Sequence, residues 1–294
     1  MESKQSLFGA SFDQSKRIID KSILTEEGAN MGVLSSMSFW RRLIGLVGLL
    51  MMIIMYGVGI GFPDQLRQST ENVQMISQQS AALIGEIGLY LRPVIKILLF
   101  TIIALTVLNL VPKVNYAHQM LYGIFYLLVL QLVGLIAVLP ISIGLTIDTF
   151  GMTAFYIQIV FCCFFIKKYV IDETKNFKAY LLDNGEARVS DWDVRLMTFI
   201  RKFGGILLFL AILNRWTLKI GENANENPEL MHLLLGCLFL ASILGITLVF
   251  GKWIQYSTKA FYLYKYSNEY RRYFNITNEQ WYGKFRARFM SKEK

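Results

Sequence analysis

The sequence predicts an all-α integral membrane protein that crosses a bilayer six times and keeps both chain ends on the cytoplasmic side. Three observations predict it. The 294-residue chain is 54% hydrophobic and only 17% charged, whereas globular chains average about 45–50% apolar and ~25% charged residues. The apolar residues are concentrated in long blocks, and the mean hydropathy is +0.42. The lysines and arginines are divided unequally between alternate loops.

The apolar blocks define the spans. A helix needs about 20 mainly apolar residues to cross ~30 Å of hydrocarbon. The chain accordingly divides into an N-terminal arm (1–42), a transmembrane domain (43–253) and a basic, aromatic tail (254–294). We predict spans near 43–62, 91–111, 119–140, 149–166, 199–217 and 231–253. The first is too long for the apolar part of a signal peptide, so it indicates an uncleaved anchor.

The connections between spans differ in character. The long connection 167–198 is basic, and we assign it to the cytoplasm. The connection 141–148 (ISIGLTID) is itself apolar. It fits either a tight outer turn or a short re-entrant piece, and the sequence leaves both open.

Orientation follows from the positive charges, since loops rich in Lys and Arg stay in the cytoplasm. The arm, the turn 112–118, the loop 167–202 and the chain from Lys252 hold 25 of the 30 Lys and Arg residues. This predicts a multi-pass protein of the cell membrane with both termini inside. The same excess of positive charge suits anionic lipid headgroups.

Two lysines after a pair of cysteines, in QIVFCCFFIKKYV, mark the predicted inner end of the fourth span. Adjacent helix residues point about 100° apart, whereas structural zinc sites favour cysteines two to four residues apart. Cys162 and Cys163 are therefore interpreted as small apolar side chains. Three cysteines, all inside apolar runs, do not suggest a disulfide framework.

Cations near the outer end of the second span form one candidate site. Arg92 and Lys96 are one helical turn apart, and Asp148 is a possible counter-charge. The simpler interpretation is that both cations extend toward the outer headgroups. The functional interpretation is a cationic vestibule for an anionic solute or a partner carboxylate.

Small residues at a spacing of four occur in two spans. Gly57 and Gly61 lie in the first, and Ala241 and Gly245 in the sixth. Such pairs let helix backbones approach closely. Packing within the protein is favoured over packing between two copies.

The tail carries the second candidate site. TNEQWYGKFRARFM opens with a capping-box pattern. A continuous helix from there aligns Trp281, Phe285 and Phe289, with positive charges around them. This pattern is typical of a helix that lies on anionic lipid, and a partner protein is the main competing ligand. Aromatic and basic residues together also bind single-stranded nucleic acid, which we consider less suited to a membrane-tethered tail. The contact residues are predicted to be Trp281, Lys284, Phe285, Arg286, Arg288 and Phe289.

The absence of known catalytic motifs from the sequence is the main guide to its function. The sequence contains no metalloprotease, nucleophile-elbow or phosphate-loop motif, so no catalytic, cofactor or metal site is predicted. The leading hypothesis is a non-enzymatic subunit of a larger secretion, export or immunity-type membrane assembly. Its cytoplasmic loop and tail would dock partners or anionic lipid. The alternative is a small-solute transporter or channel, possible as a homo-oligomer, with Arg92 and Lys96 at its outer mouth. The lack of eukaryotic sorting signals favours a bacterial inner membrane.

Overall fold

The computed structural model describes residues 6–25, 36–68, 76–111, 113–182, 198, 201, 202, 205 and 234–290. Within these ranges all regular structure is helical, which confirms the all-α prediction there. Four helical stretches in this part of the chain are long and apolar enough to cross a membrane: Phe39–Gln68, Gln78–Leu110, Tyr116–Leu182 and Leu238–Lys265. A multi-pass membrane protein is thus supported, while the count of six spans stays a prediction.

The first predicted span, 43–62, lies inside a longer helical stretch. A 3-10 turn at Ile44–Leu46 and a wide π turn at Gly57–Gly61 join three helices end to end. Ile53 on this stretch is 70% exposed, as expected where lipid replaces water as the solvent. The three helices are α4 (Phe39–Leu43), α5 (Val47–Tyr56) and α6 (Phe62–Gln68).

The second predicted span, 91–111, is the later part of α7 (Gln78–Leu110). Ser77 caps the helix, because its hydroxyl accepts the amide of Ser80 at 3.2 Å. The helix continues through Pro93. At 1.5 Å per residue it is about 50 Å long, well beyond the ~30 Å thickness of a hydrocarbon core.

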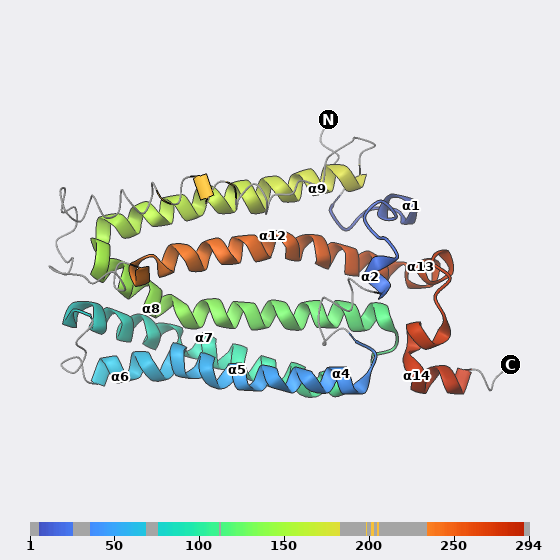
Figure 1. The fold of residues 1–294 in the computed structure, drawn as a ribbon, viewed down its shortest axis with the longest axis horizontal. Helices are drawn as coiled ribbons and strands as arrows, with labels where there is room; N and C mark the ends of the chain where they lie inside the picture. Colours follow the sequence, from blue (N-terminus) through green and yellow to red (C-terminus); the bar gives the residue numbers. More distant parts are fainter. Residues whose placement is uncertain are drawn as a thin grey trace.

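The third and fourth predicted spans, 119–140 and 149–166, both lie in α8 (Tyr116–Ile166). The helix is broken at Gly151, whose φ of 80° and ψ of 169° are far from helical values. Such a φ is accessible mainly to glycine. After it the chain runs back in the opposite direction, and in Figure 1 α12 lies between the two arms of α8. The two spans are therefore two arms of one hairpin, 116–150 and 152–166.

The connection 141–148 is neither the outer turn nor the re-entrant piece that the sequence left open. It is helical and extends the first arm. Its small and apolar residues allow close packing, because a Cβ added at Gly144 would clash with the side chain of Ile84 on α7. The reversal instead falls three residues later, at Gly151.

The predicted loop 167–198 begins as a helix. A π turn at Lys167–Asp172 leads directly into α9 (Glu173–Leu182). The second arm thus continues past the two lysines that were expected to end it. The last predicted span, 231–253, corresponds to α12 (Leu238–Lys265), which extends 12 residues further. The fifth, 199–217, lies almost entirely outside the described residues.

The long helices lie side by side along one direction (Figure 1). Both α7 and α12 pack along α8, and the first helical stretch packs on α7. Gly59 permits a close approach, because a Cβ there would lie 2.9 Å from the backbone of Ala137 on α8.

Four short helices gather at one end of the bundle, on the right of Figure 1. We call this the cap end, and the end with Gly151 the far end. The short helices are α1 (Phe12–Ser15), α2 (Ser22–Thr25), α13 (Ser267–Tyr273) and α14 (Asn278–Met290).

Candidate functional site

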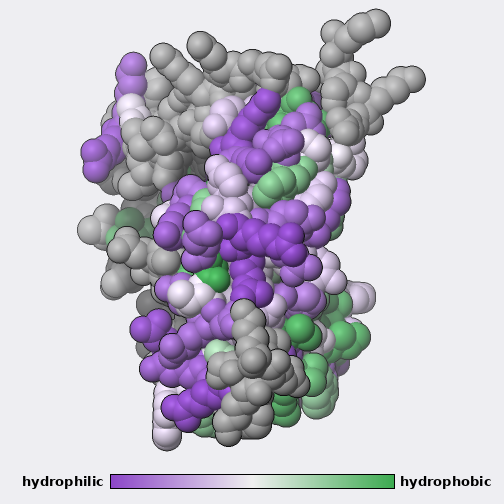
Figure 2. Space-filling view, turned by 90° about the vertical axis from the view of Figure 1, so that its right-hand side faces the viewer, coloured by the Kyte–Doolittle hydropathy of each residue, from purple (hydrophilic) through white to green (hydrophobic). Residues whose placement is uncertain are grey.

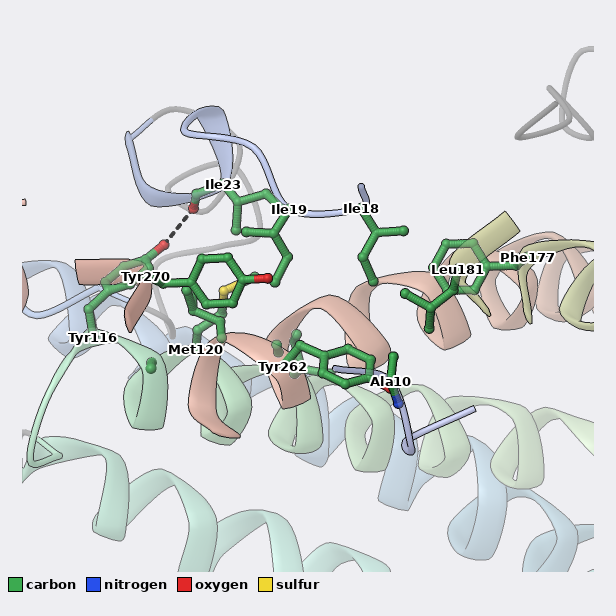
Figure 3. Packing of buried hydrophobic residues seen from close by; sticks show 14 of the residues in the cluster. Ala10, Ile18, Ile19, Ile23, Tyr116, Met120, Phe177, Leu181, Tyr262 and Tyr270 are labelled. Carbon is green, nitrogen blue, oxygen red and sulfur yellow. Dashed lines mark hydrogen bonds between the residues drawn. The ribbon is translucent and has the colours of Figure 1, made fainter. Parts of the chain in front are cut away.

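The cap is held together by a buried apolar cluster from four distant parts of the chain. It joins the N-terminal arm, the start of α8, the end of α9 and the segment from α12 to α14. Figure 3 shows these side chains pointing toward one another. The labelled members are Ala10, Ile18, Ile19, Ile23, Tyr116, Met120, Phe177, Leu181, Tyr262 and Tyr270. The stretches that the sequence assigns to one side of the membrane therefore meet at one end of the molecule.

Tyrosine hydroxyls attach the N-terminal arm to α12. The hydroxyl of Tyr262 accepts the amide of Ala10 at 2.8 Å and donates to the carbonyl of Leu7 at 2.7 Å. The hydroxyl of Tyr266 donates to the carbonyl of Ala10 at 2.9 Å. Each bond satisfies a backbone group of a segment with little regular structure of its own, so the arm is fixed by side chains.

A second pair of tyrosines reaches the following part of the arm. The hydroxyls of Ser15 and Tyr270 lie 2.5 Å apart, and both residues are fully buried. Tyr116 donates to the carbonyl of Ile23 at 2.9 Å, the bond drawn dashed in Figure 3. Burial raises the pKa of Tyr270 above its ordinary value, so this hydroxyl stays protonated in alkaline solution in which an exposed tyrosine ionises.

The structure corrects the predicted placement of Trp281. This residue has no exposed surface, and its ring centroid lies 6.3 Å from that of Tyr116. The predicted continuous helix is broken at Gly283, where φ is 80° and ψ is 158°. Residues before and after the break do not share one helical face. Trp281 is therefore part of the cap core, and no exposed aromatic stripe runs through this segment from it.

The basic residues of the same segment divide between two environments. Lys284 is exposed and only 3.9 Å from Glu279, and Arg288 is exposed as well. Arg286 instead donates to the carbonyls of Lys113 and Val114, at 3.2 and 3.0 Å. The side chains of Phe285 and Phe289 lie outside the described part of the structure.

The turn between α7 and α8 holds Arg42 and Lys113 in addition to Arg286. Arg42 is 2% exposed and donates to the carbonyls of Ser36, Met37 and Leu110. Lys113 donates to the carbonyl of Leu108 at 3.0 Å. Burial, and then repulsion from Arg42, lower the pKa of Lys113. Cations at the carbonyl end of a helix are favoured by its dipole, so they stabilise the end of α7.

Charged side chains cover the outside of the cap. Figure 2 views the molecule from the cap end and shows hydrophilic residues over most of its coloured surface, with hydrophobic ones mainly toward the lower right. Exposed cations outnumber exposed acidic groups in the described part of the cap. The cations are Arg17, Lys21, Lys175, Lys265, Arg272, Lys284 and Arg288, and the acidic residues are Asp13, Asp20, Glu269 and Glu279.

At the far end the predicted vestibule residues lie in three different settings. Arg92 forms an ion pair with Asp64 on α6. Asp148 is fully buried and accepts the amide of Ser77 at 3.0 Å, so it helps to fix the start of α7. Lys96 lies one helical turn after Arg92 on α7 and is exposed. Arg92 and Asp148 thus bind different groups, and Lys96 lies at the surface.

Lys96 lines a groove between α5 and α7 whose cavity volume is about 580 Å³. Met52 and Leu99, both buried, lie among its lining residues. Ile53 and Phe100 are each 70% exposed and line it as well. The full lining is Leu49, Met52, Ile53, Tyr56, Lys96, Leu99, Phe100 and Ile103.

The predicted small-residue pairs face open space in the described structure. A Cβ added at Gly57 or Gly245 would meet none of the described atoms within 4 Å. Ala241 is exposed, and Gly61 is approached only by the carbonyl of Tyr56, at 3.9 Å. The close helix contact is made by Gly59 instead, which lies between the members of the predicted pair. Intramolecular packing through those pairs stays a prediction.

Among the described residues, no group of three or more His, Cys, Asp or Glu side chains could hold a metal ion. Cys162, Cys163 and Cys237 are free thiols. The fold and the cap define an all-helical protein of the membrane class with one elaborated polar end. Compared with protein-family models, with curated proteins and with solved structures, the chain matches none of them.

Several residues that shape the cap were not predicted from the sequence, and it contains a signal for only some of them. Tyr262, Tyr266 and Tyr270 recur at intervals of four, which places them on one helical face. Arg42 follows an exposed Trp40 and Arg41 in SFWRRL, and nothing local distinguishes the buried arginine from its exposed neighbour. Ser15, a polar residue between Phe12 and Ile19 in the arm, is buried as a hydrogen-bond partner of Tyr270.

Proposed function

We propose that the protein is a non-enzymatic subunit of a larger membrane assembly of the secretion, export or immunity type, which docks a partner protein through the outside of its cap. The observation that carries this proposal is the form of the cap. It has its own buried core, and its exterior is polar and rich in cations. A structured polar end of this kind is suited to recognition, because the positions of its charges are fixed.

The charge balance favours an acidic partner surface, with anionic lipid headgroups beside it. Electrostatic complementarity gives such contacts specificity and speeds association. The proposed orientation places the cap in the cytoplasm of a bacterial cell, since cytoplasmic loops carry the Lys and Arg excess. Several cap cations also lie over aromatic rings, for example Lys16 at 4.4 Å from the centroid of Phe12, which limits their freedom to move.

The transporter alternative has less support in the described part of the chain. Its cationic outer mouth needs Arg92 and Lys96 to act together. Arg92 is neutralised by Asp64, and Lys96 lies on the α5–α7 groove. Solute flux through the purified protein in liposomes would nevertheless favour that alternative over the docking proposal.

The test is chemical cross-linking and affinity capture of the full-length protein from its native membrane. The variant Lys175→Gln/Arg272→Gln/Lys284→Gln removes three exposed cap charges without touching the cap core. We expect loss of a stoichiometric partner from this variant. Deleting the tail would be less informative, because it removes Tyr262, Tyr270 and Trp281 from the core.

The matched control is Arg67→Gln, which removes an exposed cation at the far end and should leave capture unchanged. Unchanged capture by the triple cap variant would contradict the proposal, as would the lack of any stoichiometric partner. Equal loss in the control would show a general charge effect and would contradict it too.

A further inference from the structure

We infer that the groove between α5 and α7 is a binding site for an anionic phospholipid, with Lys96 holding the headgroup and the apolar lining holding an acyl chain. The site is lined by residues of α5 and α7 that are not part of the cap cluster, and it does not depend on the docking proposal. Its volume of about 580 Å³ falls within the ~300–1,000 Å³ typical of ligand sites.

The composition of the groove matches an amphiphile with one negative charge. Lys96 is its single charged lining residue, and the other lining residues are apolar or aromatic. Within the described structure, Lys96 makes no hydrogen bond and no ion pair. A cation on a surface that faces lipid is costly unless an anion or water reaches it. The phosphate of a lipid headgroup supplies such an anion.

The direction of the Lys96 side chain sets the orientation of the phospholipid in the groove. The α-helix tilts each side chain toward its own N-terminus, and the N-terminus of α7 is at the far end, beside Asp148. Lys96 therefore extends toward the level of the Arg92–Asp64 ion pair, one helical turn away. Charged pairs and extended lysines are typical of the membrane–water boundary. The headgroup belongs at that level, in the leaflet at the far end.

The apolar part of the groove leads from Lys96 in the opposite direction. Along α7 it continues through Leu99 and Phe100 to Ile103, a distance of about 10 Å at 1.5 Å per residue. Along α5 it continues from Tyr56 to Leu49. An acyl chain lying there would cover Ile53 and Phe100, the two most exposed apolar residues of the lining.

The experiment uses the full-length protein in bilayers that contain a trace of photoactivatable phosphatidylglycerol or of phosphatidylcholine with the same acyl chains. Cross-linked peptides are then mapped by mass spectrometry. We expect labelling within 49–56 and 96–103, with phosphatidylglycerol favoured about fivefold, the ratio that one basic residue at an anionic surface provides.

Matched variants separate the effect of the Lys96 charge on lipid labelling from the effect of the apolar groove. In Lys96→Gln the preference for phosphatidylglycerol should fall to about one, and Lys96→Arg should keep it. Ile103→Trp fills the groove and should reduce labelling by both lipids. Lys167→Gln removes an exposed cation on the second arm and should change nothing within these peptides.

Three results would overturn the inference. They are equal labelling by the two lipids in the unmodified protein, an unchanged preference in Lys96→Gln, and efficient disulfide formation between two copies carrying Ile53→Cys. The last result would mean that a second copy of the chain covers the groove.

Discussion

The hydroxyls of Ser15 and Tyr270 lie 2.5 Å apart although 255 positions separate the residues in the chain. The hydroxyl of Ser15 also donates to the carbonyl of Phe12 at 2.8 Å, so Tyr270 is the donor of the shared bond. This contact ties the N-terminal arm to the segment that follows the last candidate span. The integrity of the cap therefore depends on both ends of the chain.

Removing either hydroxyl should destabilise the cap. Tyr270→Phe and Ser15→Ala each leave a buried polar group without its partner, which costs about 1–3 kcal/mol. The double variant should cost little more than one single variant, because the partners are removed together. Thermal unfolding in detergent measures all three. Tyr273→Phe, at a 54% exposed tyrosine, should be close to neutral, and fully additive effects of the two main variants would contradict the prediction.

Stability should fall in alkaline solution partly through Tyr270. Burial raises the pKa of its hydroxyl above the ordinary value of 10.0, and nearby tyrosines reinforce that effect. Above pH 10 the unfolded chain loses this proton while the folded cap retains it, so the free energy of unfolding decreases with pH. Below pH 10 the contribution of the protonated Tyr270 hydroxyl to the free energy of unfolding is fully present.

Thermal unfolding between pH 8 and pH 11 tests this, with Tyr270→Phe as the comparison. The variant is less stable at pH 8, yet its stability should decline less steeply above pH 10. Parallel declines in the two proteins would show that Tyr270 does not titrate differently on unfolding.

Trp281 should be a determinant of stability. Its complete burial in the cap predicts a loss of about 3–5 kcal/mol in Trp281→Ala. Trp281→Phe should cost less, because the buried indole N–H has no hydrogen-bond acceptor among the described residues and its removal relieves that penalty. Trp40→Ala changes a 77% exposed residue and should alter unfolding in detergent by less than about 0.5 kcal/mol. Equal effects of Trp281→Ala and Trp40→Ala would place Trp281 on the surface.

The two adjacent arginines should behave differently. Arg42→Gln removes a buried cation from three carbonyl groups and should destabilise the protein by about 1.5–3 kcal/mol. Arg42→Lys should recover only part of this, because an ammonium lacks the planar fork of the guanidinium. Arg41→Gln alters an exposed side chain and is the natural control. If Arg41→Gln proved as damaging as Arg42→Gln in thermal unfolding, the burial argument would fail.

The effects of Asp64 and Arg92 on stability should depend on each other, because the two residues form an ion pair. Asp64 and Arg92 are each about one-third exposed, so solvent screening limits the pair to about 0.2–1 kcal/mol. Asp64→Arg and Arg92→Asp should each reduce stability, and the double exchange should restore most of it. A double variant whose loss equals the sum of the two single losses would show that the residues do not interact.

Local composition was enough to predict the helical membrane class. The long apolar stretches 43–62 and 91–110 are helical, because the hydrogen-bond pattern of a helix satisfies each backbone group inside its own segment. The element ends were predicted less well. The second span gained 13 residues at its start, since α7 begins where Ser77 caps it and Asp148 accepts the amide of Ser77. That contact comes from a residue 71 positions away.

The candidate sites, like the helices, could be predicted from the sequence only in part. The sequence by itself determined that cations are concentrated in the arm, the connections and the tail, because charge follows directly from residue type. Only the tertiary structure decided which of these cations are exposed, that Trp281 is buried, and that Arg92 and Lys96 lie in separate settings. Burial and pairing depend on segments brought together from as far as 255 positions apart, and no local pattern records such contacts.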